Sequence, residues 1–338
     1  MKFKKMLTLT VVVLTVFAFM SVAFASSDAL VDGGPAFQTL ERIEIIVYGS
    51  PQGGGLLSRL NSAEKDVFGR ELPGSLTERQ TAMLDFLEKG TTTQPSLLFK
   101  LSVAEWAVIQ EIHPGWSLAK RIDTLEAIVE GTVQGGAFAS RTERLIMKLL
   151  PEGVLATPVE IPASTVVKTS LAQTLTVRNV KVDDKVVLKL IEEIVIAKNL
   201  VAPKGSRVFA HITKVKPPRS FGRASEIEMA FDALEVIGPN SVTVNMGEAA
   251  KKAMETDSGT IGAVGASFAG AVLLGPLGLA GGFLVRGSDN HLKEGTFFYV
   301  ETTAAATVKG YMIPSQISSM TVSGDVTSPQ GTASQIKP

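Results

Sequence analysis

Residues 47–59 read VYGSPQGGGLLSR, and residues 67–79 repeat this pattern as VFGRELPGSLTER. In both stretches an aromatic residue and a glycine are followed by a loop rich in glycine or proline, and then by leucine and arginine. A third copy begins at Glu130-Gly131 and includes Ser140-Arg141. An internal repeat of this length is typical of supersecondary units that stack on one another.

Each copy predicts a helix that ends at a glycine, followed by a short loop and a new helix. Apolar residues at helical spacing precede Gly49 and Gly69. A glycine after the last turn fits the left-handed conformation that side chains disfavour. Ser75 and Glu78 are spaced for a capping box at the start of the next helix. We predict an α-helical repeat domain over residues 37–150, because short helices bury their apolar faces only by packing together.

Three arginines occupy the same place in the three copies: Arg59, Arg79 and Arg141. One hypothesis is that they lie on the surface of the repeats and bind an anionic partner, such as another envelope protein. The alternative is that they pair with neighbouring acidic residues on a solvated helix face. Likewise, the repeat domain is either a binding surface or a helical spacer.

The second half of the chain has the pattern of a β-domain, which we place at residues 158–311. Apolar and polar residues alternate in residues 226–231 and 242–244, and β-branched residues are frequent in residues 186–196. Turns such as Pro203-Lys204-Gly205-Ser206 separate these stretches. The chain is therefore predicted to be an α+β multidomain protein, with the helical repeats followed by an antiparallel β-barrel or sandwich.

The β-domain contains a long stretch without charge, Ser258 to Val285, which we call the uncharged segment. With charged flanks it forms a predicted hairpin insertion over residues 246–286. We expect a helical first arm up to Gly275-Pro276 and a second arm that returns to the β-domain. The first arm carries a stripe of small residues that suits close helix packing in lipid or between subunits. The residues expected to mediate membrane contact or self-association are Gly259, Ala263, Ser267, Phe268, Gly270, Ala271 and Gly275. The alternative is a hairpin packed against its own barrel.

The N-terminus predicts export from the cytoplasm. Lys2, Lys4 and Lys5 precede an apolar run and the Ala23-Phe24-Ala25 site, so residues 1–25 are expected to be a cleaved signal peptide, the alternative being an uncleaved anchor helix. The chain has no cysteine and hence no disulfide framework. Residues 312–338 lack periodicity and are predicted to be a disordered tail. These features favour the bacterial periplasm.

Several motifs resemble those of known bacterial proteins. The short helix, Tyr/Phe-Gly and Gly-Ser-Leu-x-x-Arg units, together with the β-domain turns, resemble uncharacterised cell-envelope proteins of diderm bacteria. The Pro203-Lys204-Gly205-Ser206 turn and the Gly-rich hairpin are more distantly similar to the C-terminal β-barrel of the VirB10/TrbI secretion-channel family. That resemblance implies a β-domain that faces the outer membrane. Unlike that family, this chain is expected to lose its N-terminal segment.

Composition and motifs argue against an enzyme or a nucleic-acid-binding protein. The formal net charge is zero and aromatic residues are 6% of the chain, which argues against nucleic-acid partners. The three histidines have no ligand spacing, and Ser117-Leu118-Ala119-Lys120 is best explained as a chance match to a serine acyl-enzyme motif. We predict no catalytic residue, metal or cofactor.

The leading hypothesis is a non-enzymatic envelope protein that associates with the outer membrane, or with itself, through the hairpin. The alternatives are a soluble periplasmic binding or scaffold module and, least favoured, an envelope hydrolase.

Overall fold

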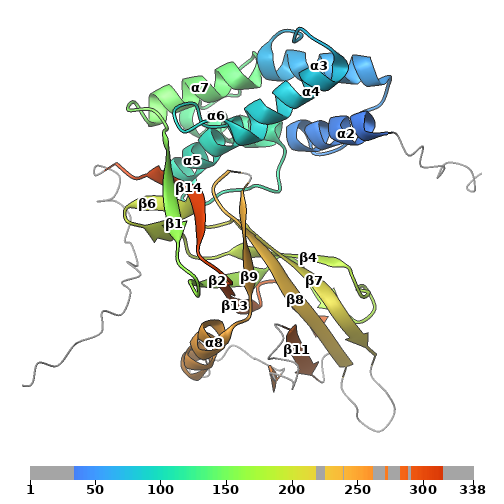
Figure 1. Ribbon diagram of the computed structural model, residues 1–338, viewed down its shortest axis with the longest axis vertical. Helices are drawn as coiled ribbons and strands as arrows, with labels where there is room; N and C mark the ends of the chain where they lie inside the picture. The colour runs from blue at the N-terminus through green and yellow to red at the C-terminus, as the bar shows by residue number, and fades with distance from the viewer. Residues whose placement is uncertain are drawn as a thin grey trace, which may run out of the picture.

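The N-terminal part of the chain is helical, as the repeat predicts. The computed structural model describes residues 34–217, 225–238, 240–261, 271–272, 282–287 and 291–314. A five-residue π-helix, η1 (Asp85–Lys89), continues directly from the α-helix that ends at Leu84. The helices of this part, grouped together in Figure 1, are α2 (Pro35–Tyr48), α3 (Leu56–Phe68), α4 (Leu76–Leu84), α5 (Leu97–Ile109), α6 (Leu118–Glu130) and α7 (Phe138–Leu149).

The helix ends confirm the local sequence predictions. Gly49, Gly69 and Gly131 follow α2, α3 and α6 with φ of 90°, 76° and 77°, a conformation that glycine adopts without a steric cost. The Ser75 side chain accepts a hydrogen bond from the Glu78 backbone, and the Glu78 carboxylate accepts one from the Ser75 backbone. The predicted capping box is thus present at the start of α4.

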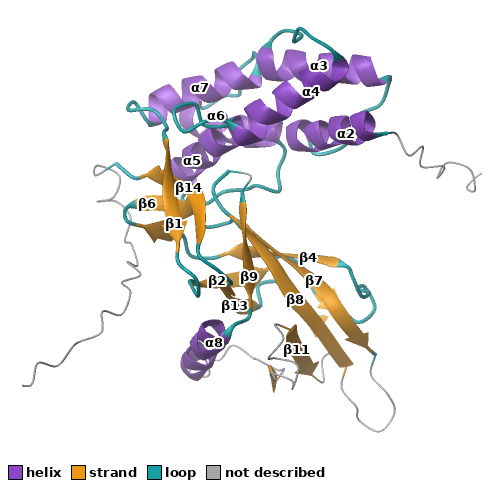
Figure 2. Cartoon of the chain, in the orientation of Figure 1, coloured by secondary structure: helices purple, strands orange, loops and turns teal. Residues whose placement is uncertain are grey.

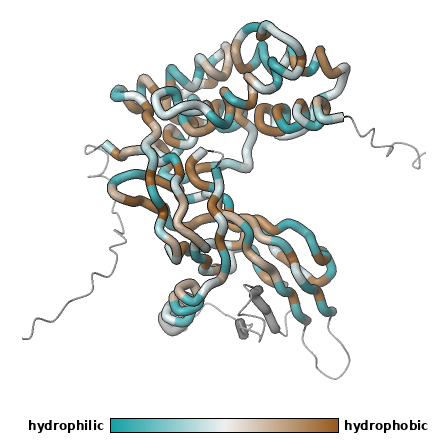
Figure 3. Tube along the Cα trace, viewed as in Figure 1, coloured by the Kyte–Doolittle hydropathy of each residue, from teal (hydrophilic) through white to brown (hydrophobic). Residues whose placement is uncertain are grey.

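Six antiparallel strands form a closed barrel. The order is β8-β7-β4-β2-β13-β9, and β9 pairs again with β8 to close the ring. Buried apolar residues alternate with outward residues along the strands, as in β4, so the interior is filled by side chains. Figure 3 shows this alternation of hydropathy along β7 and β8. The barrel strands are β2 (Val166–Leu171), β4 (Lys185–Leu190), β7 (Arg207–Lys216), β8 (Ser225–Glu235), β9 (Ser241–Asn245) and β13 (Phe297–Thr302).

A second, smaller sheet lies between the helices and the barrel (Figure 1). Its strand order is β1-β14-β6-β5. A two-stranded sheet pairs β3 (Leu175–Thr176) with β12 (His291–Leu292). The strands of the four-stranded sheet are β1 (Ala156–Ile161), β14 (Ala306–Met312), β6 (Asn199–Ala202) and β5 (Ile194–Ile196).

The helices and the small sheet share one hydrophobic core. Trp106 of α5 is fully buried, lies edge-on to Tyr311 of β14 with ring centroids 6.4 Å apart, and donates its indole N–H to Glu193 at 2.6 Å. The backbone N–H of Ile112 also bonds the Lys204 carbonyl at 2.9 Å. The contact between the helices and the β-part is therefore a packed core with backbone hydrogen bonds.

The structure corrects the predicted helical arm of the hairpin. Helix α8 (Glu248–Ile261) ends at Ile261, while Ala271–Val272 form strand β10. Strand β10 pairs with β11 (Gly282–Gly287), so a helix through Ala271 is wrong. Glycine has a low helix propensity, and β-pairing supplies these backbone groups with partners instead. The return of the second arm to the β-domain is confirmed, because β11 pairs with β8.

Several other sequence predictions lie outside the described residues. Residues 1–33, which include the predicted signal peptide, and residues 315–338 of the predicted tail belong to this group. Strand β14 extends to Met312. Among the described residues, no helix is both long enough and apolar enough to traverse a bilayer.

Candidate functional site

Four buried glutamate–arginine pairs connect successive helices of the repeat domain. In each pair the arginine Nη2 lies 2.5–2.6 Å from the glutamate Oε2, and both side chains are almost completely shielded from solvent. Such pairs are stable only when further hydrogen bonds satisfy the remaining polar atoms. The pairs are Glu44–Arg59, Glu64–Arg79, Glu105–Arg121 and Glu126–Arg141.

The same glutamates also fix the loops between the helices. The Oε2 atom of each accepts a backbone N–H from the residue eight positions later, at 2.8–3.2 Å. Each carboxylate thereby connects the end of its own helix, the following loop and the arginine of the next helix. The residues that donate these backbone hydrogen bonds are Gln52, Leu72, His113 and Gln134.

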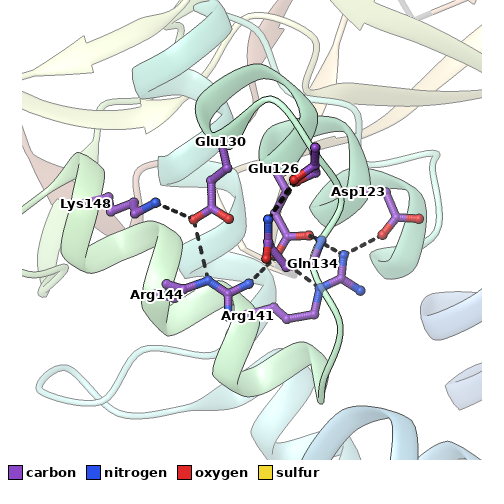
Figure 4. Close-up of polar contacts among 8 residues, drawn as sticks. Asp123, Glu126, Glu130, Gln134, Arg141, Arg144 and Lys148 are labelled. Atoms are coloured by element: carbon purple, nitrogen blue, oxygen red, sulfur yellow. Dashed lines mark hydrogen bonds and ion pairs between the residues drawn. The ribbon is translucent and has the colours of Figure 1, made fainter.

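The pair between α6 and α7 belongs to a larger network (Figure 4). Arg141 also donates to Asp123 at 2.5 Å, and Arg144 donates to Glu126 at 2.7 Å. Burial alone would raise the pKa of Glu126. The hydrogen bonds from Arg141 and Gln134, with the charges of Arg141 and Arg144, outweigh burial and lower that pKa. The carboxylate is held ionised and fully engaged, so it is not placed for proton transfer.

The structure corrects the expected surface location of the repeated arginines. Arg59, Arg79 and Arg141 are 5%, 8% and 5% exposed. They do pair with acidic residues, but in the interior and not on a solvated face. Their guanidinium groups are therefore occupied within the chain.

The glutamate partners were missed by the sequence analysis, although a signal for them exists. In each of the three repeat copies, a glutamate lies 15 residues before the repeated arginine. These glutamates are Glu44, Glu64 and Glu126. The fourth pair was missed because its glutamate and arginine are 16 residues apart. Its loop also contains Pro114-Gly115-Trp116 instead of the aromatic-glycine pattern.

The residues considered for catalysis have structural roles in the described chain. Ser117 caps α6 by accepting the backbone N–H of Lys120 at 3.2 Å, and the Lys120 ammonium lies 3.8 Å from the centroid of the Trp116 ring. His211 pairs with Asp232 on the barrel exterior at 2.8 Å. Across the described ranges, no three acidic, histidine or cysteine side chains are grouped to hold a metal ion.

Both ends of the uncharged segment are attached to the barrel. The buried Glu301 carboxylate of β13 accepts the Ala250 backbone N–H at 2.7 Å, near the start of α8, and α8 packs on β13 and β2. At the other end, β11 pairs along Ser225 to Ala230 of β8. Figure 2 shows α8 and β11 at the end of the molecule away from the repeat helices. Of the predicted hairpin residues, Gly259 lies in α8 and Ala271 in β10, whereas Ala263, Ser267, Phe268, Gly270 and Gly275 lie outside the described residues.

Acid is expected to destabilise the fold through two buried carboxylates. The folded-state pKa of Glu126 is lowered, and that of Glu226 is lowered by hydrogen bonds from Lys216 and Lys214 despite burial. Their stabilisation is complete above the unfolded pKa of about 4.3 and is lost as the pH falls through the lower folded values. Urea unfolding at a series of pH values from 7 to 3 should show a constant free energy above about pH 5 and a steep fall below the unfolded pKa.

The variant Glu126→Gln provides the control for this pH dependence. It should be less stable at pH 7 but should lose less additional stability in acid, because one of the two carboxylates no longer titrates. If the free energy of unfolding of this variant falls as steeply in acid as that of the wild type, the assignment to Glu126 is wrong.

Comparison with known proteins gives a distant likeness to a solved structure. No protein-family model matches the chain, and no curated protein matches it. Among solved structures, the chain is similar to ComB10 of the Com type IV secretion system of Helicobacter pylori, at 10% sequence identity and a TM-score of 0.23. The match covers 47% of this chain and 93% of that one.

Proposed function

We propose that this chain is a non-enzymatic, exported cell-envelope scaffold that attaches to the outer membrane through the uncharged segment. The observation that carries the proposal is the attachment of this segment to one end of the barrel. Strand β11 and helix α8 lie at that end, away from the repeat helices (Figure 2). Membrane attachment there leaves the repeat domain directed toward the aqueous periplasm.

The chemistry of the segment and its flank supports membrane attachment. The uncharged segment has no Asp, Glu, Lys or Arg, and apolar surface of this extent is favourably transferred from water to lipid. The first ten residues of α8 precede it and carry charged residues that include Glu248 and Lys251, paired at 2.8 Å. A charged helix followed by an apolar stretch suits the boundary between water and the bilayer.

The helical repeats are suited to a structural role in this scaffold. Each glutamate–arginine pair connects a helix, a loop and the next helix, so the pairs cross-link α2 to α4 and, separately, α5 to α7. A rigid domain of this kind is suited to holding a fixed position between the membrane and a protein partner at the repeats.

Flotation with vesicles tests the proposal. The purified mature chain is mixed with phosphatidylethanolamine–phosphatidylglycerol vesicles and centrifuged through a density gradient. We expect the wild-type chain to float with the vesicles and the variant Ala263→Asp/Phe268→Asp to remain at the bottom, because two carboxylates oppose transfer of the segment into lipid.

A matched control places the same two charges outside the segment, as Ala333→Asp/Ile336→Asp. This variant should float like the wild type. Recovery of the wild-type chain entirely in the lipid-free fraction would overturn the proposal, as would equal flotation of the Ala263→Asp/Phe268→Asp variant.

A second candidate function is a soluble periplasmic binding or scaffold module, and the pairing of β11 with β8 favours it. This pairing places residues 282–285 of the uncharged segment within the protein's own sheet. Sedimentation of the mature chain distinguishes the candidates: a monomer in plain buffer that does not bind vesicles supports the soluble module. A mass that rises with concentration, and returns to that of a monomer in Gly270→Leu, supports self-association.

A further inference from the structure

A cavity of about 180 Å³ lies where the helices meet the barrel. Its walls come from the end of α2, from the loop between α5 and α6, and from the chain that follows β8. Boundaries between structural units are common places for ligand sites. For comparison, a cavity of about 150 Å³ is large enough to hold benzene. Apolar residues in its walls include Ile46, Leu98, Ile112, Trp116 and Val236.

The polar part of the wall contains an arginine with an unused donor. Arg121 is 2% exposed, and its Nη2 donates to Ser102 at 2.9 Å and to Glu105 at 2.6 Å. Its Nε is buried and has no hydrogen-bond partner among the described residues. A buried donor without a partner costs about 1–3 kcal/mol, so it is a strong site for an acceptor.

The unpaired Nε donor of Arg121 distinguishes the Glu105–Arg121 pair from the other three glutamate–arginine pairs. In those pairs the arginine Nε donates to the glutamate Oε1, at 2.8–3.1 Å. At the fourth pair, Glu105 and Arg121 are separated by one extra residue, and Glu105 Oε1 lies 4.0 Å from His113 Nδ1 instead. The departure from the repeat thus occurs at the pair whose arginine and Ser102 line the cavity.

The charges around the cavity cancel. Arg121 is paired with Glu105, Arg207 with Glu235 at 2.7 Å, and Glu88 with Arg42 at 2.8 Å. A ligand with a net charge would therefore be buried without a counter-charge, at a large cost. A neutral ligand avoids this cost, and the carboxylates of Glu88 and Glu235 retain lone pairs for a ligand N–H group.

We propose that this cavity binds a small neutral amide. The amide oxygen accepts the Arg121 Nε–H, the amide N–H lies on the carboxylate side of the cavity, and the apolar part of the ligand packs against Ile46, Trp116 and Val236. The proposal is independent of membrane attachment, because the cavity lies on the side of the barrel that faces the repeat helices and no described residue of the uncharged segment lines it.

The two tryptophans of the chain provide a readout by NMR. Trp116 lines the cavity, whereas Trp106 does not. Uniformly ¹⁵N-labelled mature chain is titrated with benzamide, and the two indole N–H signals are assigned with Trp116→Phe. We expect the Trp116 signal to shift with a Kd of about 1 mM, a typical value for so small a ligand, and the Trp106 signal to stay in place.

Ligands of the same size test the predicted chemistry. Benzoate and benzylammonium share the ring of benzamide but carry opposite charges. Both should bind at least about tenfold more weakly, because each brings an uncompensated charge into the cavity. Binding of benzoate as tight as that of benzamide would overturn the assignment to a neutral amide.

Two variants test the residues. Arg121→Lys keeps the positive charge but removes the Nε donor, and should weaken benzamide binding about tenfold, the usual worth of one buried hydrogen bond. Ile46→Phe fills part of the cavity and should abolish the Trp116 shift. Its control is Ile128→Phe, the same change at an exposed residue that does not line the cavity.

Each outcome supports or overturns the proposal. If Arg121→Lys fails to fold, Ile46→Phe and the charged ligands still decide the result. The highest benzamide concentration is about 20 mM, which is roughly 20 times the expected Kd. If the Trp116 signal does not shift at this concentration, the cavity holds only water. Unchanged binding in folded Arg121→Lys, or in Ile46→Phe, would place benzamide elsewhere.

Discussion

The substitution Glu126→Ala is expected to lower the free energy of unfolding by about 3–5 kcal/mol, the usual result of removing one partner from a buried ion pair. Glu126 is fully buried and accepts hydrogen bonds from Arg141, Arg144 and the Gln134 backbone (Figure 4). Without the carboxylate, the Arg141 guanidinium remains buried with only the half-exposed Asp123 as its acidic partner. Urea denaturation followed by circular dichroism at 222 nm measures the loss.

The matched control is Glu143→Ala in α7, the helix that also carries Arg141. Glu143 pairs with Lys100, but its side chain is 48% exposed, and surface pairs contribute about 0–1 kcal/mol. A second comparison removes both charges, as Glu126→Leu/Arg141→Leu. This double variant should be more stable than Glu126→Ala, since no buried charge remains in the pair without a partner. Equal stability of Glu126→Ala and Glu143→Ala would contradict a structural role for the buried pairs.

The substitution Gly205→Ala is expected to cost about 3 kcal/mol and to weaken the contact between the helices and the barrel. Gly205 has φ of +87°, where a side chain costs about 1 kcal/mol or more. A Cβ atom there would also lie 2.2 Å from the Ile112 carbonyl oxygen, a backbone atom of the loop between α5 and α6. Relieving that overlap adds about 1–3 kcal/mol and displaces the hydrogen bond from Ile112 to Lys204. Thermal and urea unfolding measure the total.

An equivalent turn elsewhere in the barrel supplies the control. Gly295 has φ of +81°, donates its N–H to the Leu171 carbonyl much as Gly205 donates to that of Leu190, and has open space where a Cβ would be added. Gly295→Ala should therefore cost only the conformational part, about 1 kcal/mol. If the two variants lose the same stability, the close approach of the helices at Gly205 does not contribute to the fold.

Much of the fold class is predictable from short stretches of sequence. The glycines at positions 49 and 69 end helices because only glycine adopts their backbone angles without cost, and Ser75 begins one because its side chain caps the first turn. Alternation in residues such as 226–231 likewise specifies a strand with one buried face. These signals depend on neighbours within a few residues, which is why the α+β organisation is correctly predicted.

The same local reasoning fails for the uncharged segment and the repeated arginines. A period of four in small residues suggests a helix through Ala271, but β10 forms there because β11 offers backbone partners. The repetition predicts arginines on the surface, because a charged side chain is usually exposed. Their burial depends on glutamates 15 residues earlier, whose approach follows from the packing of two helices.

The sequence alone therefore determined the helical repeats, their capped ends and the alternating strands, because hydrogen bonds and side-chain periodicity within one element specify them. Only the tertiary structure decided that β9 closes the barrel onto β8 and that Trp106 joins the helices to the small sheet. It also decided that the fourth glutamate–arginine pair leaves a donor beside a cavity. These features join residues far apart in the chain, and their free energy comes from contacts that exist only once the elements have packed.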